Sequence, residues 1–91
     1  GELIIDDGAK KALKNGKSLL AAGIRKVSGK FSKGDHIKIL DIKNIEFARG
    51  LSSFSSDEVR KIMGRQSNEI GKILGYVSKS EIVHKDDMVI V

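Results

Sequence analysis

Residues 3–27 read LIIDDGAKKALKNGKSLLAAGIRKV, and the order of elements in this stretch decides the fold. The apolar residues 3–5 predict a short strand, and Asp6 and Asp7 are typical caps for a helix that begins near Ala9. In that helix alanine and leucine recur every three or four residues, and the lysines fall between them. The stretch therefore predicts a strand and then a short helix that presents lysines to solvent.

Two further strands are expected after this helix. Gly16 supplies the permissive backbone that ends the helix, residues 18–21 look like a buried strand, and residues 24–27 look like the next one. Between these strands Gly23 favours a bend or a close approach of two backbones, because it carries no Cβ.

A hairpin is predicted in the middle of the chain. Residues 33–35 form a turn, and two alternating runs follow at residues 37–39 and 45–47. Lys43 and Asn44 join these runs, since asparagine tolerates the left-handed conformation that a tight turn needs.

Helical segments come next. Ser55 and Glu58 have the spacing of a capping box, which predicts a helix that runs to Met63 and ends at Gly64. A second helical piece is predicted for residues 67–74, before Gly75. Its residues expected to pack inward are Ile70, Ile73 and Leu74.

Closing strands are expected at residues 76–77 with 81–83, and at residues 88–91. Many short strands with two or three short helices predict a mixed, mainly β, α/β domain, a small barrel of about five to six strands. Closing the sheet removes the edges that a small antiparallel sheet would otherwise expose.

Composition limits the class of protein. The 91 residues fit a single domain, residues 1–91, and a hydrophobic content of 40% supports a globular fold. The absence of cysteine excludes disulfides and thiolate metal sites, as is usual in the cytosol. No apolar run approaches the length of a bilayer span and no signal segment opens the chain, so we expect a soluble, cytoplasmic protein without membrane contact.

Basic residues are concentrated in one part of the chain. Between Gly8 and Gly34 there are eight basic residues and no acidic one, whereas the rest of the chain holds nine basic and twelve acidic residues. The eight are Lys10, Lys11, Lys14, Lys17, Arg25, Lys26, Lys30 and Lys33. Such a stretch forms either an anion-binding face or a solvated lysine-rich face.

No complete catalytic or metal-binding arrangement is found. Residues 16–18, Gly-Lys-Ser, look like the end of a phosphate-binding loop, but that motif needs a glycine where this chain has Lys11. His84 beside Asp86 and Asp87 is a conceivable metal or acid–base cluster, although the same residues are typical of a solvated turn. We therefore assign no catalytic residue, metal or cofactor to this chain, and a short chain favours a binding or regulatory module over an enzyme.

Structured RNA is the polyanion that the residues favour. Lysine and arginine supply most sequence-independent affinity for nucleic acid, because they neutralise phosphates. The aromatic residues are Phe31, Phe47, Phe54 and Tyr76, and Phe47 is expected in the core, so base stacking is poorly provided for. Recognition of the shape and backbone of a folded RNA is the favoured mode.

Short segments spread in order over the whole chain resemble the PUA domain, a fold named for pseudouridine synthases and archaeosine transglycosylases. These segments are Asp6-Asp7-Gly8-Ala9, Lys17-Ser18-Leu19-Leu20 with Gly23-Ile24, Val27-Ser28-Gly29-Lys30-Phe31 with Gly34-Asp35, Ala48-Arg49-Gly50-Leu51, Ile73-Leu74-Gly75-Tyr76 and His84-Lys85-Asp86-Asp87-Met88. The resemblance is greatest to the C-terminal PUA domain of bacterial glutamate 5-kinases. Lys43-Asn44-Ile45 departs from the pattern, because relatives often place a glycine there.

The resemblance implies a pseudo-barrel whose first helix and following strand form the face that PUA domains of RNA-modifying enzymes place on RNA. That face falls within the basic stretch. Carried over by position, the candidate RNA contacts are Gly16, Lys17, Ser18, Gly23 and Ile24, flanked by Lys10, Lys11, Lys14, Arg25 and Lys26.

The resemblance also implies that the chain is the C-terminal module of a cytoplasmic kinase that phosphorylates the side-chain carboxylate of glutamate, the first step of proline synthesis. ATP and Mg²⁺ would be held by a kinase domain that precedes Gly1, and the whole enzyme is expected to be a homo-oligomer. The alternative is a module that binds no RNA and instead contacts the kinase domain, where it tunes activity, feedback inhibition by proline or assembly.

Overall fold

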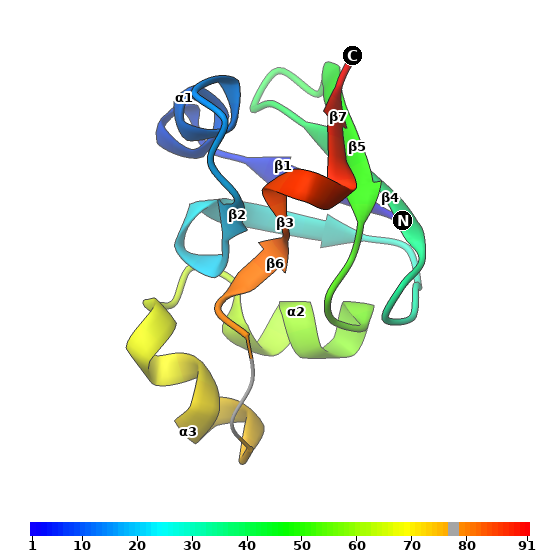
Figure 1. Cartoon of the computed structure of the whole chain (residues 1–91). Helices are drawn as coiled ribbons and strands as arrows, with labels where there is room; N and C mark the ends of the chain where they lie inside the picture. The colour runs from blue at the N-terminus through cyan, green and yellow to red at the C-terminus, as the bar shows by residue number, and fades with distance from the viewer. Residues whose placement is uncertain (77–78) are drawn as a thin grey trace.

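A five-stranded sheet forms the main wall of the computed structural model, which describes residues 1–76 and 79–91. Across the sheet the strands follow the order β3 (Ile24–Ser28), β1 (Glu2–Ile5), β4 (His36–Leu40), β5 (Glu46–Leu51) and β7 (Met88–Ile90) (Figure 1). β1 and β4 run parallel, and the other neighbours are antiparallel. The predicted hairpin is confirmed as β4 and β5, and Asn44 in its turn has a left-handed φ of 66°.

A second sheet of two strands closes the first one. β2 (Leu19–Leu20) pairs antiparallel with β6 (Glu81–Val83). β2 leads through a 3-10 turn (Ala21–Gly23) into β3, and β6 leads through another (Lys85–Asp87) into β7. Since β3 and β7 are the two edges of the large sheet, the pairing of β2 with β6 closes a small barrel. The predicted fold class is confirmed, with seven strands in the described residues.

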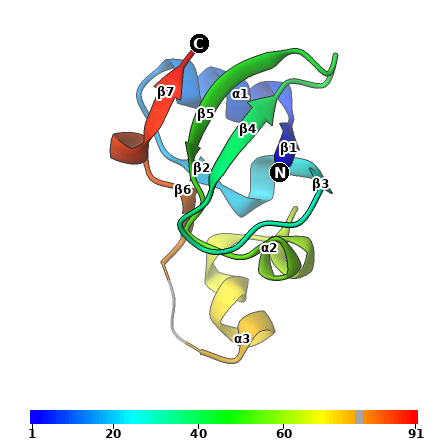
Figure 2. The ribbon, with the colours of Figure 1, turned by 90° about the vertical axis from the view of Figure 1, so that its right-hand side faces the viewer.

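Three helices surround this barrel. α1 (Asp7–Lys14) lies beside β1 and β2, whereas α2 (Ser56–Ile62) and α3 (Ile70–Leu74) cover the opposite end (Figures 1 and 2). The predicted capping box begins α2: the Ser55 hydroxyl accepts from the Glu58 N–H at 3.2 Å, and the Glu58 carboxylate accepts from the Ser55 N–H at 3.0 Å.

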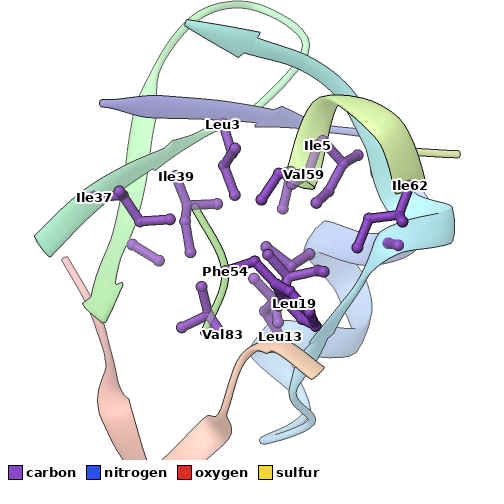
Figure 3. Close-up of a cluster of buried hydrophobic side chains, with 14 of the residues drawn as sticks. Leu3, Ile5, Leu13, Leu19, Ile37, Ile39, Phe54, Val59, Ile62 and Val83 are labelled. Atoms are coloured by element: carbon purple, nitrogen blue, oxygen red, sulfur yellow. The ribbon is translucent and has the colours of Figure 1, made fainter. Parts of the chain in front are cut away.

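The core is built from apolar side chains of both sheets and all three helices. Figure 3 shows side chains of β1, β4, α1 and α2 pointing toward one another across the barrel. Val59 and Ile62 of α2 are fully buried, and Phe47 lies in the core as expected. The buried aromatic and aliphatic surface is the main favourable contribution to folding.

Several predicted boundaries are wrong. The strand expected at residues 18–21 is limited to Leu19–Leu20, because Ala21–Gly23 turns the chain so that the Gly23 carbonyl accepts from Asp6. Ile73 does not pack inward and is 36% exposed, since the five residues of α3 bury mainly the side of the helix that carries Ile70.

Two expectations concern the last third of the chain. Tyr76 lies in a bend rather than a strand, where its hydroxyl donates to the Glu58 carboxylate, and Val77 lies outside the described residues.

In the part of the chain that the structure describes, no helix is long and apolar enough to cross a membrane.

Candidate nucleic-acid interface

A cleft of about 320 Å³ separates α1 from the segment that follows it. One wall is formed by Gly8, Ala9 and Ala12 of α1. The other wall is formed by residues 17–20, Ala22 and Gly23, and Asp6 also lines the cleft. Because glycine and alanine provide half of the lining residues and occur in both walls, a ligand in the cleft would contact backbone atoms on both sides.

Asp6 fixes the two walls relative to each other. Its carboxylate accepts from the Ala9 N–H at 2.8 Å and caps α1, as the sequence predicts. Its own N–H donates to the Gly23 carbonyl at 2.9 Å. The other carboxylate oxygen lies 3.6 Å from the Arg25 guanidinium on β3. One side chain therefore couples the start of α1 to the start of β3.

Gly23 confirms the predicted close approach of two backbones. A Cβ placed on Gly23 would lie 2.4 Å from the Ala9 Cβ, far inside the contact distance of two carbon atoms. Only glycine allows α1 to lie this close to the 3-10 turn, and this sets the width of the cleft.

The segment after β6 also reaches the cleft. The Ser18 hydroxyl accepts from the Lys85 N–H at 2.8 Å, so Ser18 and Lys85 are neighbours although 67 residues separate them. The Lys85 side chain is exposed. The sequence alone does not reveal this contact, because only the pairing of β2 with β6 brings Lys85 beside Ser18.

The structure brings some of the predicted contacts together. Lys17, Ser18 and Gly23 line the cleft. Lys11 and Lys14 are exposed on α1. Of the predicted lysines Lys17 is the one in the cleft lining, whereas Lys11 and Lys14 are exposed elsewhere, on α1.

Lys10 has a different environment. Its ammonium lies 2.9 Å from the Asp41 carboxylate and 5.6 Å from the centre of the Phe47 ring. The hydrogen bond from Lys10 is the main reason that the pKa of Asp41 is lowered, and backbone N–H groups of Ile45 and Lys43 lower it further. Lys10 therefore ties α1 to the β4–β5 turn rather than pointing freely to solvent.

The remaining predicted contacts lie further along the chain. Gly16 follows the helix with a φ of 78°, and Lys26 is exposed on β3. Ile24 is 2% exposed and belongs to the hydrophobic core. Arg25 is exposed but forms the ion pair with Asp6 already described.

The eight basic residues do not all belong to one face. Lys33 lies close to Glu58 of α2, whose pKa is lowered chiefly by the hydrogen bond from the Tyr76 hydroxyl and to a smaller extent by the Lys33 charge. The basic stretch is thus divided between the cleft and the α2 end of the barrel.

The His84 cluster is a structured turn. The His84 Nδ1 accepts from the Asp86 N–H at 3.1 Å and caps the 3-10 turn of residues 85–87. Within residues 1–76 and 79–91, no group of three or more histidine, cysteine, aspartate or glutamate side chains is placed to hold a metal ion.

Comparison with known proteins identifies the family. The PUA domain model matches residues 1–74. Glutamate 5-kinase of Pelagibacter ubique is 75% identical over 98% of this chain, and that of Bartonella henselae is 53% identical over 99%. The chain spans 24% of the length of each of these two relatives.

Solved structures show the same fold. A PUA domain from Aeropyrum pernix K1, in a tartrate complex, superposes with a TM-score of 0.65 at 22% identity, covering 92% of this chain and 42% of that one. A chain of the archaeal box H/ACA sRNP Nop10–Cbf5 complex gives a TM-score of 0.61 at 31% identity, covering 64% of this chain and 19% of that one. From its sequence and from its barrel, the chain belongs to the PUA domain family.

Proposed function

We propose that this domain binds structured RNA in the cleft between α1 and β2. The observation that carries the proposal is the open cleft of about 320 Å³ that is lined by the exposed Lys17 and in which glycine and alanine provide half of the lining residues. Lysine ammonium groups neutralise phosphates, and small residues let an RNA backbone approach the protein closely.

The composition of the cleft sets the mode of binding. Phe31, Phe47 and Phe54 are buried, and the exposed Tyr76 does not line the cleft, so stacking on aromatic rings is not part of the proposed contact. Contacts to phosphate, ribose and the shape of a folded RNA remain. The likeness to a chain of an archaeal sRNP supports RNA as the polyanion.

A salt titration of the 91-residue chain with a transfer RNA tests this function. We expect binding at low salt and a linear fall in the logarithm of the association constant with the logarithm of salt concentration. Replacing Lys17 by alanine should reduce that slope by about one, since one phosphate contact is lost. Negligible binding at low salt would overturn the proposal.

The domain is further assigned to the chain of a glutamate 5-kinase, which phosphorylates glutamate with ATP and Mg²⁺ in its kinase domain. Identities of 75% and 53% over nearly the whole domain support this parentage. The proposed parent enzyme is a cytoplasmic homo-oligomer, and none of its substrate-binding residues is assigned to the present chain.

A regulatory role is the second candidate, because the domain spans only 24% of its kinase relatives and so has other parts of the chain to act on. Removing the domain from the full-length enzyme tests it. Altered kinetics, altered inhibition by proline or altered assembly is expected if the domain is regulatory, and unchanged values of all three would exclude this role.

A further inference from the structure

Five exposed apolar side chains gather at one end of the barrel. Ile42 and Ile45, in the turn between β4 and β5, are 57% and 58% exposed. Val89, Ile90 and Val91, at the end of the chain, are 67%, 46% and 64% exposed. The turn and the end of β7 lie at the same end of the molecule in both views, and none of the five residues lines the cleft (Figures 1 and 2). We name these five residues the apolar end.

The apolar end includes the outer edge of a sheet. The Val91 N–H donates to the Phe47 carbonyl at 2.9 Å, which holds the end of the chain beside β5. On its other side β7 has no strand partner among the described residues. Strand edges that face water are usually protected by charged side chains or proline, and residues 88–91, Met-Val-Ile-Val, contain neither.

Part of each face of β7 is exposed, although Met88, which shares a face with Ile90, packs against the core. Val89 pairs with Arg49, and Ile90 pairs with Ala48. Because Val89 and Ile90 are consecutive residues of one strand, their side chains point to opposite faces of the sheet. Ala48 is fully buried, whereas Ile90 beside it is 46% exposed. An exposed apolar patch around an unpaired edge is typical of an interaction surface.

We propose that the apolar end packs against the kinase domain of the longer chain that contains this domain. The inference rests on the proposed parentage, in which the domain is one module of a glutamate 5-kinase. The chain spans 24% of the Pelagibacter relative, so most residues of that relative lie outside the matched region.

Covalent linkage favours this occupant over a second copy of the domain. A neighbour in the same chain is present at a high effective concentration, so that even a small apolar surface is sufficient to hold it. Two separate copies would have to bury the larger area that stable interfaces need.

Hydrogen exchange of the domain can be compared between the full-length kinase and the isolated 91-residue chain. The backbone amides of residues 88–91 and of the turn at residues 42–45 are expected to exchange about tenfold more slowly in the full-length kinase than in the 91-residue chain. Equal exchange in the two proteins would overturn the proposal. Slowing in the 91-residue chain that grows with its concentration would also overturn it, in favour of a second copy.

A pair of matched double variants gives an independent measurement. Ile42→Lys with Val89→Lys changes the apolar end, and Met63→Lys with Ile73→Lys makes the same charge change at exposed apolar residues near α2 and α3. Only the first pair should speed limited proteolysis of the domain within the full-length kinase, by about tenfold. Similar effects of both pairs would contradict the proposal.

This experiment is separate from the test of RNA binding. Neither Ile42 nor Val89 lines the cleft, so the first double variant should keep the transfer-RNA affinity of the 91-residue chain. Failure to bind RNA would leave the exchange result standing, and equal exchange would leave the RNA proposal standing.

Discussion

The ammonium of Lys10 lies 2.9 Å from the carboxylate of Asp41, across 31 positions of sequence. Asp41 is buried, and its other carboxylate oxygen accepts from the N–H groups of Lys43 and Ile45 at 2.9 and 3.0 Å. One carboxylate therefore organises the turn between β4 and β5 and also anchors α1 to that turn. This pair makes Lys10 a structural residue in a helix whose other lysines face solvent.

Replacing Lys10 by methionine should lower the melting temperature of the domain. Methionine leaves the buried Asp41 carboxylate without its cation, and a buried carboxylate is costly to leave unpaired. Lys43→Met is the matched control, since Lys43 is exposed on the same turn. Circular dichroism melting curves measure the effect, and equal melting temperatures of the two variants would contradict the structural role of Lys10.

The stability difference between the wild type and Asp41→Asn should depend on pH. Lys10 is the main cause that lowers the pKa of Asp41 below its ordinary 3.8. A carboxyl group with a lowered pKa in the folded state stabilises that state above its unfolded pKa and loses this effect as pH falls through the folded pKa. The difference in melting temperature should therefore be constant above about pH 5 and shrink at pH values below 3.8, the ordinary pKa of the aspartate carboxyl group.

The comparison of the wild type with Asp41→Asn isolates the contribution of the Asp41 carboxyl group to the pH dependence. Glu46 and Glu58 also have lowered pKa values, because Arg49 and Tyr76 respectively donate hydrogen bonds to them, but both are present in the two proteins and cancel in the difference. A melting-temperature difference that stays constant down to the acid transition would show that the charge of Asp41 does not stabilise the folded state.

Gly23→Ala should destabilise the domain by about 1–3 kcal/mol, as overpacking of a close contact does. The added Cβ would meet the Ala9 Cβ at 2.4 Å and push α1 away from the 3-10 turn. Gly8→Ala is the control, because its added Cβ would meet its nearest atom at an ordinary 3.5 Å. Urea unfolding of both variants measures the change, and equal free energies of unfolding would refute the close packing of α1 on Gly23.

The phenol of Tyr76 should ionise above its ordinary pKa of 10.0. The hydrogen bond that its hydroxyl donates to Glu58 is the main cause of the raised pKa, with desolvation and the Glu58 charge adding to it. Tyr76 is the only tyrosine in the chain, so the absorbance of the phenolate reports this residue alone. Glu58→Gln should move the pKa back down, while glutamine still fits the capping box. Identical titrations of the two proteins would exclude the contact.

Local signals in the sequence predicted local structure well. The capping box of Ser55 and Glu58 and the left-handed turn at Asn44 depend on residues within a few positions of each other, and the structure contains both. Gly23 was also predicted to allow a close approach, although its partner Ala9 was not. Such features need little knowledge of the rest of the fold.

Contacts between distant residues could not be predicted in this way. Lys85 reaches Ser18 only because β2 pairs with β6, and Lys10 meets Asp41 only because α1 packs beside the hairpin. Charge counting along the sequence treats Lys10 and Lys17 as equivalent, yet one is held in an ion pair and the other lines the cleft. The division of the basic stretch follows from tertiary structure.

Comparing Lys17→Glu with Lys72→Glu in transfer-RNA binding tests the central claim most directly. The two variants change the net charge equally, but Lys17 lines the cleft and Lys72 is exposed on α3, at the far end of the molecule (Figure 1). If RNA occupies the cleft, Lys17→Glu weakens binding by about tenfold or more and Lys72→Glu by much less. Equal weakening by both variants would mean that RNA senses only the overall charge, and would contradict the cleft as the binding site.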